Sequence, residues 1–364
     1  MGRLSNNILT FSQEQGVDVN LYAKFKDYVN HYRAVQFKAN VDFDNTKSFE
    51  EKNAKMHEDI EQEVLKISGM KNYKFTNTIL KSNPVYKWAV DAIITSLIES
   101  IIPDVVIQDF QQFAEIQYGG YGDTFTYDID SSDLFILSKI SNGKRHAFGQ
   151  RQFKNQETLI PEARAITVET DLYRILSGKR NLAEYALKVV LSFEEQLQLD
   201  IYNAINDTYS SLGANFKAAA FTQAGFVQLA ERVSAANGGA AVTAFGTKTA
   251  LSYVLPDNDN LKLGLGTEYS KIGYIRDFMN VDMMQLNQKV EWKSGDYEFR
   301  LDNTRLYFIS TNVNKLVKIA IEGDMMTFTD TTEKQANLYE TQTMQKRWAV
   351  GLVTNAKYGI MDVA

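Results

Sequence analysis

The chain has 364 residues, of which 44% are hydrophobic and 23% are charged, as in an ordinary globular protein. It contains no cysteine, so disulfides, thiolate metal sites and cysteine nucleophiles are all excluded. The formal net charge is −6, and the sequence has no basic stripe, which argues against a nucleic-acid-binding protein. It also has no run of about 18 apolar residues, so no membrane-spanning helix is expected.

The first 83 residues are polar and rich in Lys, Glu and Asn. Within them, residues 49–67 place apolar side chains three, four or seven positions apart, which predicts a helix with one apolar face. That stripe consists of Phe49, Met56, Ile60, Val64 and Ile67. A second, apolar helix is expected at residues 85–102. Pro84 suits its start, and we expect Pro103 to end it.

Alternating apolar and polar residues then predict two strands. In "DTFTYDID", Phe125, Tyr127 and Ile129 lie on one face, and "AITVETDLY" alternates again from Ile166 to Leu172. Between them lies "SNGKRHAFGQRQFKNQET", which is basic, contains glycine and has no apolar face. We therefore predict that the two strands form a β-hairpin joined by a long polar loop.

The stretch "RNLAEYALKVVLSFEEQLQLDIYNAIND" predicts one uninterrupted helix. Asn181 is a suitable N-cap, Glu184 follows three residues later, and neither glycine nor proline interrupts the segment. About 27 residues at roughly 1.5 Å each give a rod of about 40 Å, over twice the usual helix length. The apolar stripe of this rod should pack on the C-terminal strands. It includes Val190, Phe193 and Leu197.

Helices and strands alternate after the rod. We expect a helix in "TQAGFVQLAERVSAAN" closed by two glycines, a strand in "AAVTAFG", a helix in "TKTALSYVLPD" and a strand in "IRDFMNVDMMQLNQ". From about Phe299 onward strands dominate. They are expected in "FRLDNTRLYFIS", "NKLVKIAIEG", "DMMTFTDT" and "RWAVGLVTNAKYGIMDV". The whole pattern indicates an α+β chain.

No motif carries catalytic or metal-binding chemistry. His57 and Glu61 stand one helical turn apart, but the zinc-protease pattern needs a second histidine at the position of the glutamate, so a solvated helix face is expected. His31 and His146 have no spaced set of ligands. "AFGTKT" has a threonine between its glycine and lysine, which favours a strand-to-helix turn over a phosphate-binding loop. We therefore expect no catalytic, cofactor-binding or metal-binding residue, and no cofactor.

The order of these elements resembles that of the major capsid proteins of tailed bacteriophages, whose Hong Kong 97-like fold is shared with encapsulin shells. The hairpin at residues 118–175 and "LSGKRNLAEYALKVVLSFEEQLQLDIYNAIND", at the position of the family's spine helix, carry the resemblance. "GFVQLAERVSAAN" and "KIGYIRDFMNVDMMQLNQKV" are similar to the axial-domain helix and its later strand. "LVKIAIEGDMM" and "QKRWAVGLVTNAKYGIMDV" are similar to the closing strands. The resemblance covers about residues 84–364.

The resemblance implies an α+β capsid fold in five parts. These are an N-terminal arm at 1–83, an N-terminal helix region at 84–117, an extended β-hairpin loop at 118–175, a peripheral domain with the spine helix at 176–215 and 299–364, and an axial domain at 216–298. It also implies a subunit that self-assembles as pentamers and hexamers into the icosahedral head of a tailed bacteriophage. That head encloses double-stranded DNA without sequence-specific binding, and it is assembled in the host cytoplasm. Portal, scaffold and decoration proteins are further partners that such a role allows.

Two segments are expected to make contacts in a shell. The hairpin loop carries cations without local acidic partners, so we expect it to meet carboxylates of a neighbouring subunit. These cations are Lys144, Arg145, Arg151 and Lys154. A lone helix of about 20 residues is marginal in water, so the stripe at 49–67 needs a covering surface. We expect residues 1–83 to stay as an arm, packed on the subunit's own core or on an adjacent subunit, rather than to be removed as a scaffold.

Two other functions remain open. One is an encapsulin-like shell protein, although the long charged N-terminal extension favours a viral capsid. The other belongs to a different class, an α/β enzyme with dispersed catalytic residues. A shell protein forms a megadalton assembly, whereas an enzyme of this size is a monomer or a small oligomer.

Overall fold

The computed structural model describes residues 6–37, 41–69, 84–110, 113–130, 154–171, 181–288, 290, 298–310, 315–330, 339–353 and 356–363. The chain forms two compact units and passes between them several times. Unit 1 comprises Met1–Asp109, Glu162–Leu197 and Glu322–Trp348. Unit 2 comprises Phe110–Pro161, Gln198–Ile321 and Ala349–Ala364.

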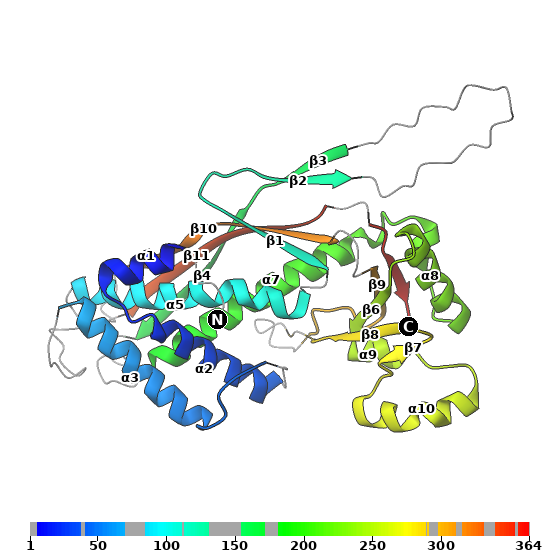
Figure 1. Ribbon diagram of the computed structural model, residues 1–364, viewed down its shortest axis with the longest axis horizontal. Helices are drawn as coiled ribbons and strands as arrows, with labels where there is room; N and C mark the ends of the chain where they lie inside the picture. The colour runs from blue at the N-terminus through cyan, green and yellow to red at the C-terminus, as the bar shows by residue number, and fades with distance from the viewer. Residues whose placement is uncertain are drawn as a thin grey trace, which may run out of the picture. The chain divides into compact units, whose positions relative to one another are not determined.

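Unit 1 packs helices on one face of a sheet (Figure 1). Its helices are α1 (Asn6–Gln15), α2 (Asn20–Phe37), α3 (Phe49–Ile67), α5 (Pro84–Phe110) and the first part of α7 (Leu182–Asn206). Its strands are β4 (Glu162–Asp171) and parts of β10 (Val317–Asp330) and β11 (Tyr339–Leu352), in the order β10-β11-β4. Strands β11 and β4 are antiparallel, with Trp348 opposite Glu162.

Helix α3 confirms the prediction for residues 49–67. Ser48 caps it by accepting a hydrogen bond from the backbone of Glu51, while the Glu51 side chain accepts one from the backbone of Ser48. Its apolar stripe faces inward and packs on α2. Met56, Ile60 and Val64 are buried, and Phe49 and Ile67 are half-buried.

Helix α5 begins at Pro84, as predicted, but Pro103 does not end it, because the helix continues to Phe110. A proline inside a helix removes one backbone donor and crowds the preceding turn. The turns before it are nevertheless held by packing, since Ile94, Leu97 and Ile101 are at most 1% exposed. Tertiary burial thus overrides the local preference for a break.

Helix α7 confirms the predicted rod. Asn181 caps it by accepting hydrogen bonds from the backbone of Ala183 and Glu184, at 2.9 and 3.1 Å. The helix runs without interruption to Asn206. Within unit 1 its apolar stripe packs toward the C-terminal strands, and the ring of Phe193 meets that of Trp348 edge-on at 6.0 Å. Val190, Phe193 and Leu197 are all buried.

The predicted hairpin exists, but its second strand lies elsewhere in the sequence. β2 (Phe125–Asp130) pairs antiparallel with β3 (Lys154–Leu159), which falls inside the stretch expected to be a loop. The other predicted strand, β4, pairs with β11 instead. β3 reads "KNQETL" and packs only Leu159 against a core, so it carries no apolar alternation that would reveal it.

Unit 2 is built on a six-stranded sheet in the order β5-β12-β9-β6-β8-β7. Its strands are β5 (Lys217–Ala218), β6 (Val242–Thr247), β7 (Asp277–Phe278), β8 (Val281–Leu286), β9 (Arg305–Ser310) and β12 (Gly359–Asp362). β6 runs parallel to β8 and antiparallel to β9. Unit 2 also contains β1 (Ala114–Gly119), which lies beside the first part of β10.

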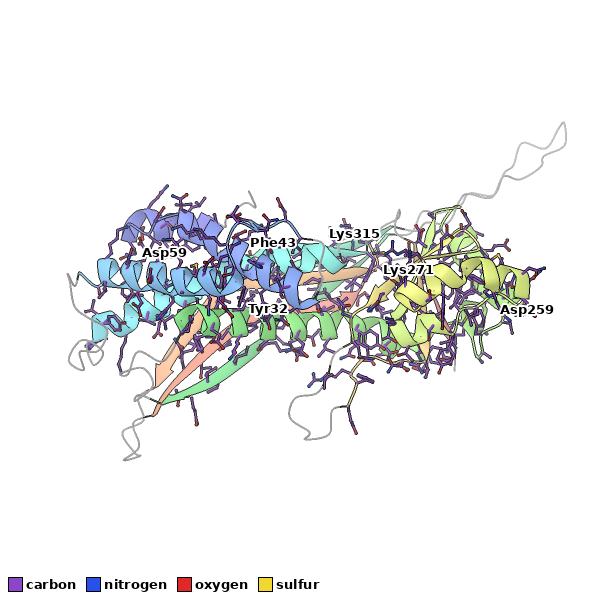
Figure 2. All side chains as sticks on the ribbon, turned by 90° about the horizontal axis from the view of Figure 1, so that it is seen from below. Tyr32, Phe43, Asp59, Asp259, Lys271 and Lys315 are labelled. Atoms are coloured by element: carbon purple, nitrogen blue, oxygen red, sulfur yellow. The ribbon has the colours of Figure 1, made fainter. Side chains whose placement is uncertain are left out.

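Two helices of unit 2, α8 and α9, follow the expected order, whereas a third, α10, was not predicted. α8 (Gln223–Ala236) is capped by Thr222 and ends before two glycines with positive φ, and its Phe226 ring lies 4.9 Å from that of Phe308. α9 (Lys248–Ser252) starts directly after β6, which confirms the strand-to-helix turn in "AFGTKT". α10 (Asp259–Ile272) places Asp259 in its first turn and Lys271 in its last (Figure 2). These charges match the helix dipole. Two short 3-10 turns, Asp207–Tyr209 and Ala214–Phe216, link α7 to β5.

Two strands expected at "NKLVKIAIEG" and "DMMTFTDT" form the single strand β10. Gly323, at the junction of the two expected strands, has a φ of 61° and stays within β10. Its carbonyl accepts a hydrogen bond from Lys346 Nζ at 2.7 Å. The conformation that only glycine adopts readily is therefore used inside a strand, rather than in a turn between two strands.

Replacing Phe193 by Ala should lower the free energy of unfolding by about 3–5 kcal/mol, because the change leaves a cavity beside Trp348. Urea unfolding of the unassembled subunit, followed by circular dichroism, measures this. Ser192→Ala is the matched control, because Ser192 is exposed on the same turn and its change should stay within about 0.5 kcal/mol. Equal losses for both variants would contradict the burial of this stripe.

Candidate assembly surfaces

The N-terminal helices are tied to the rest of unit 1 by paired charges. Arg33 on α2, which is buried, lies 2.9 Å from Glu194 on α7. Lys52 on α3 lies 2.5 Å from Asp27 on α2, and its ammonium also donates to the backbone of Asp44. Residues 6–37 and 41–69 therefore contribute to the core of the subunit. The stripe expected to dock lies inside the chain's own fold.

His57 and Glu61 form a pair on α3, with Nε2 of His57 3.0 Å from a carboxylate oxygen of Glu61. The prediction of a solvated helix face is wrong for His57. Its Nδ1 accepts a hydrogen bond from the backbone of Leu182 at 3.3 Å, at the free N-terminal end of α7. Asn53, one turn before His57, accepts from Asn181 at 3.0 Å. α3 thus caps the start of the long helix, a role that the motif search could not reveal.

His31 is held among aromatic rings. It stacks on Phe43 at 4.7 Å and meets Phe49 edge-on at 5.8 Å. Burial and the ammonium of Lys52 lower the pKa of His31 below its ordinary value, against the raising effects of Asp27 and Asp44. The imidazole is therefore kept neutral in the folded protein.

A buried ion pair joins α5 to the sheet. Lys346 on β11 is almost fully buried, and its Nζ lies 2.5 Å from Glu99 on α5. The other carboxylate oxygen of Glu99 accepts from the backbone of Met325 at 3.1 Å. Eight residues before Glu99 on α5, Asp91 accepts from Gln342 of β11, which in turn accepts from Tyr185. Sequence reasoning missed these residues, because single charged side chains in an amphipathic pattern read as surface positions.

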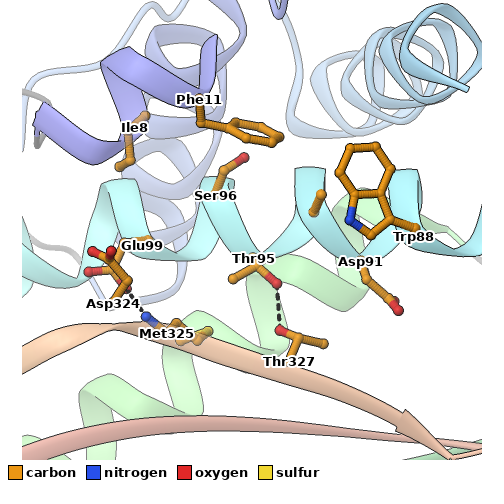
Figure 3. Close-up of a pocket in the computed structure, with 11 residues that line it drawn as sticks. Ile8, Phe11, Trp88, Asp91, Thr95, Ser96, Glu99, Asp324, Met325 and Thr327 are labelled. Atoms are coloured by element: carbon orange, nitrogen blue, oxygen red, sulfur yellow. Dashed lines mark hydrogen bonds between the residues drawn. The ribbon is translucent and has the colours of Figure 1, made fainter. Parts of the chain in front are cut away.

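A cavity of about 320 Å³ lies between α1, α5 and β10 (Figure 3). We call it the α1–α5 cavity. Its wall is mostly apolar, with carboxylates at Asp91, Glu99 and Asp324. Thr95 and Thr327 share a hydrogen bond of 2.5 Å on its sheet side. The cavity is lined by Ile8, Phe11, Trp88, Asp91, Ala92, Thr95, Ser96, Glu99, Asp324, Met325 and Thr327.

The base of the hairpin is anchored within unit 2. The hydroxyl of Tyr127 donates to the carbonyl of Ile319 at 3.2 Å, and burial, helped by Glu115, raises the pKa of Tyr127 to about 12. Lys318 pairs with Glu115 beside it. Of the predicted interface cations, Lys144, Arg145 and Arg151 lie outside the described residues. Lys154 is the first residue of β3, and its side chain also lies outside them.

A second polar cluster joins α7 to the closing strand of unit 2. Arg305 lies 3.0 Å from both Asp362 and Asn206, and Tyr307 donates to Asn206 at 2.7 Å. Burial and the neighbouring Tyr202 raise the pKa of Tyr307, so its hydroxyl stays protonated at neutral pH. The hydrogen bonds of this cluster join α7, β9 and β12, and these residues do not form a nucleophile–base pair.

The described residues contain no cluster of three or more side chains suited to a metal ion. Among the same residues, no helix combines the length and apolar character needed to cross a membrane. Of the predicted spine-helix residues, Asn181 caps α7 and Glu184 pairs with Lys188 at 2.8 Å. In the described polar clusters, charged side chains pair with one another and hold helices and strands together.

Replacing Lys346 by Met should cost about 3–5 kcal/mol of unfolding free energy, because Glu99 is left as a buried charge without its cation. The double variant Lys346→Met/Glu99→Gln should recover part of that loss, since glutamine is neutral and still accepts from Met325. Urea unfolding of the unassembled subunit gives both values. A single variant as stable as the parent would show that the pair is not buried.

Stability should fall as the pH drops below about 6.5, in part because of His31. Its pKa is lowered in the folded state, so the unfolded chain, with a pKa of about 6.5, binds the proton first. The contribution of His31 to stability is therefore fully present above pH 6.5, and it is lost as the pH falls toward the pKa of His31 in the folded state. Unfolding free energies at pH 7.5 and pH 5 measure it. His31→Gln should show a smaller drop, and equal drops would contradict the assignment.

Comparisons with known proteins agree with a structural role. Residues 34–362, almost the whole chain, match the family described as "SPbeta prophage-derived putative capsid protein YonB". No curated protein matches the sequence.

Solved structures with a similar chain include "Microbacterium phage Oxtober96", at 12% identity and a TM-score of 0.44, covering 70% of this chain and 91% of that one. "Mycobacterium phage Adephagia" has 14% identity and a TM-score of 0.46, with 70% of this chain and 89% of that chain covered. "Capsid of native GTA particle computed with C5 symmetry" has 10% identity and a TM-score of 0.49, with 70% of this chain and 89% of that chain covered. These TM-scores are below 0.5, so the family match and the order of elements carry the assignment. The helices and strands of the chain confirm the expected α+β class. The chain belongs to this family of prophage-derived capsid proteins, which confirms the capsid role expected from its sequence.

Proposed function

We propose that this capsid protein self-assembles, as pentamers and hexamers, into the closed icosahedral head of a tailed phage or prophage particle. The match of residues 34–362 to a capsid-protein family is the observation that carries the proposal. The head encloses double-stranded DNA without reading its sequence, which suits a chain of net charge −6. Assembly takes place in the host cytoplasm, and portal, scaffold and decoration proteins are further partners.

The subunit acts through its surfaces and has no catalytic role. The polar clusters around Glu99 and around Arg305 have their charges paired within the fold, which suits rigidity. In this role the long helix α7 serves as a beam. Two domains form the surface of the shell. They are the peripheral domain at 176–215 and 299–364 and the axial domain at 216–298. The region at 84–117 provides the helix that the arm covers.

The hairpin loop of residues 118–175 reaches a neighbouring subunit. Lys144, Arg145, Arg151 and Lys154 meet carboxylates there, at about 0–1 kcal/mol for each exposed pair. Such contacts are heterologous, because a patch on one copy meets a different patch on the next, and rotation closes them into rings. Residues 1–83 stay with the mature subunit as an arm packed on its own core. The pairing of Arg33 with Glu194 supports that retention.

Purified protein should form particles of megadalton size that appear as closed shells in electron micrographs. DNA inside particles recovered from the host separates a phage head from an encapsulin-like shell, which would hold a cargo protein instead. The Ser192→Ala variant should assemble as the parent does, since Ser192 is an exposed residue on α7. A monomer or small oligomer under all assembly conditions would contradict the proposal and favour an enzyme.

Intact mass spectrometry of subunits taken from particles tests the fate of the arm. We expect the mass of the full chain of 364 residues, because α2 and α3 are part of the core. A subunit shortened by its first 70–83 residues would show that the arm is a scaffold that is removed.

A further inference from the structure

The α1–α5 cavity has the size and the wall of a site for a small ligand. Its volume of about 320 Å³ lies at the lower end of ligand sites. An apolar cavity of roughly 150 Å³ holds one benzene ring, so this one has room for two fused rings. Large apolar side chains supply most of the wall. They are Ile8 and Phe11 of α1, Trp88 of α5 and Met325 of β10 (Figure 3).

Trp88 offers a flat apolar surface at this site. Its side chain leaves 48% of the residue exposed, whereas Ile8 and Met325 on the same wall are only 4% and 6% exposed. The exposed part of an indole is a surface on which another ring can stack or pack edge-on. A large exposed aromatic residue beside an apolar cavity is typical of a binding site rather than of a closed core.

The hydroxyl groups of the wall already have partners within unit 1. Thr95 and Thr327 bond each other at 2.5 Å. Ser96 donates to the carbonyl of Ile93 at 2.8 Å and accepts from Tyr22 at 3.2 Å. A ligand would therefore have to break an existing hydrogen bond to gain one from these groups.

The carboxylates of the wall are engaged in the same way. Glu99 pairs with Lys346, and Asp91 accepts from Gln342. Asp91 and Asp324 each have a further interaction within the chain. The wall thus needs no cation from outside for its pairing, and its acidic side chains would repel an anion. The free energy of binding would come from apolar contact.

These observations select a neutral molecule with few polar atoms. A polar ligand would lose its hydrogen bonds to water in the cavity without replacing them, which costs free energy. The same reason argues against an inserted peptide segment, because each of its residues brings a backbone N–H and a C=O that need partners. A small aromatic molecule loses little by leaving water and gains contact with the apolar wall.

We propose that the α1–α5 cavity binds a small, neutral aromatic molecule the size of two fused rings, which packs against the indole of Trp88. Such a ligand contacts α1, α5 and β10 at once, and because it binds the folded chain it stabilises unit 1 by mass action. The whole wall belongs to one unit of one subunit. The proposal therefore goes beyond the proposed function and does not depend on assembly.

Three probes of one size and different charge test the chemistry of the site. Isothermal titration calorimetry of the purified full chain with naphthylmethanol, which is neutral, should show saturable binding of one molecule per subunit. The midpoint of thermal unfolding should rise with the concentration of this probe. Naphthoate, an anion, and naphthylmethylammonium, a cation, should bind several-fold more weakly. A cation that binds as tightly as the alcohol, or more tightly, would show a charge-selective site and overturn the proposal.

Variants of the wall locate the binding. Ala92→Leu fills part of the cavity and should abolish binding of naphthylmethanol, whereas Ala235→Leu, the same change at an exposed position of α8, should leave the affinity unchanged. Trp88→Ala removes the surface on which the ring packs and should weaken binding several-fold. Unchanged binding by Ala92→Leu would place the probe elsewhere and overturn the proposal. So would the absence of saturable binding to the parent chain up to the solubility limit of the probe.

Circular dichroism shows whether each variant is folded. Should Ala92→Leu fail to fold, Ala92→Met, whose side chain adapts more easily to a cavity, takes its place with the same expected and contradicting results.

Discussion

Unit 1 depends on the burial of helix α5 from two sides. Ala89, Ile93, Ile94, Leu97 and Ile98 have no exposed surface, so neither side of the helix can face water. Each large apolar side chain contributes about 1.5–3 kcal/mol when it is removed from solvent. Helix α2 meets α5 through Tyr22 and Ser96, and β10 meets another side of it through Thr327 and Thr95 (Figure 3). A single apolar helix thus requires the first and the last parts of the chain to fold together.

Polar groups on α5 set how the two layers align on it. Ser96 accepts from Tyr22 on α2 at 3.2 Å, and Thr95 bonds Thr327 on β10. Glu99 meets Lys346 on β11. A shift of the helix by one residue would place these groups against apolar neighbours, and a buried polar group without a partner costs about 1–3 kcal/mol. Because buried ion pairs add little net stability, we interpret these pairs as determinants of register.

The helices of this chain could be predicted from sequence, since an apolar stripe with a cap depends on residues close together along the chain. The capping box at Ser48 and the Asn181 cap are examples. Strand pairing depends on residues far apart, which explains why β4 was matched to β2 when its partner is β11. β3 has solvated residues on both faces, so period-two alternation cannot mark it. The roles of Lys346 and His57 were hidden for the same reason, because their partners lie on other elements.

A shell subunit needs contacts that are specific in place but weak one at a time. In the proposed shell, a patch on one copy meets a different patch on the next, so each copy carries both halves of a heterologous contact. An exposed ion pair contributes only about 0–1 kcal/mol, so a misplaced copy can dissociate before the lattice closes. Once a ring of subunits is complete, each further contact forms between groups that are already held close together. Their high effective concentration makes the combined binding free energy of many weak contacts large. The buried ion pairs, such as Lys346 with Glu99, lie instead inside the subunit, where they fix how its helices and strands align.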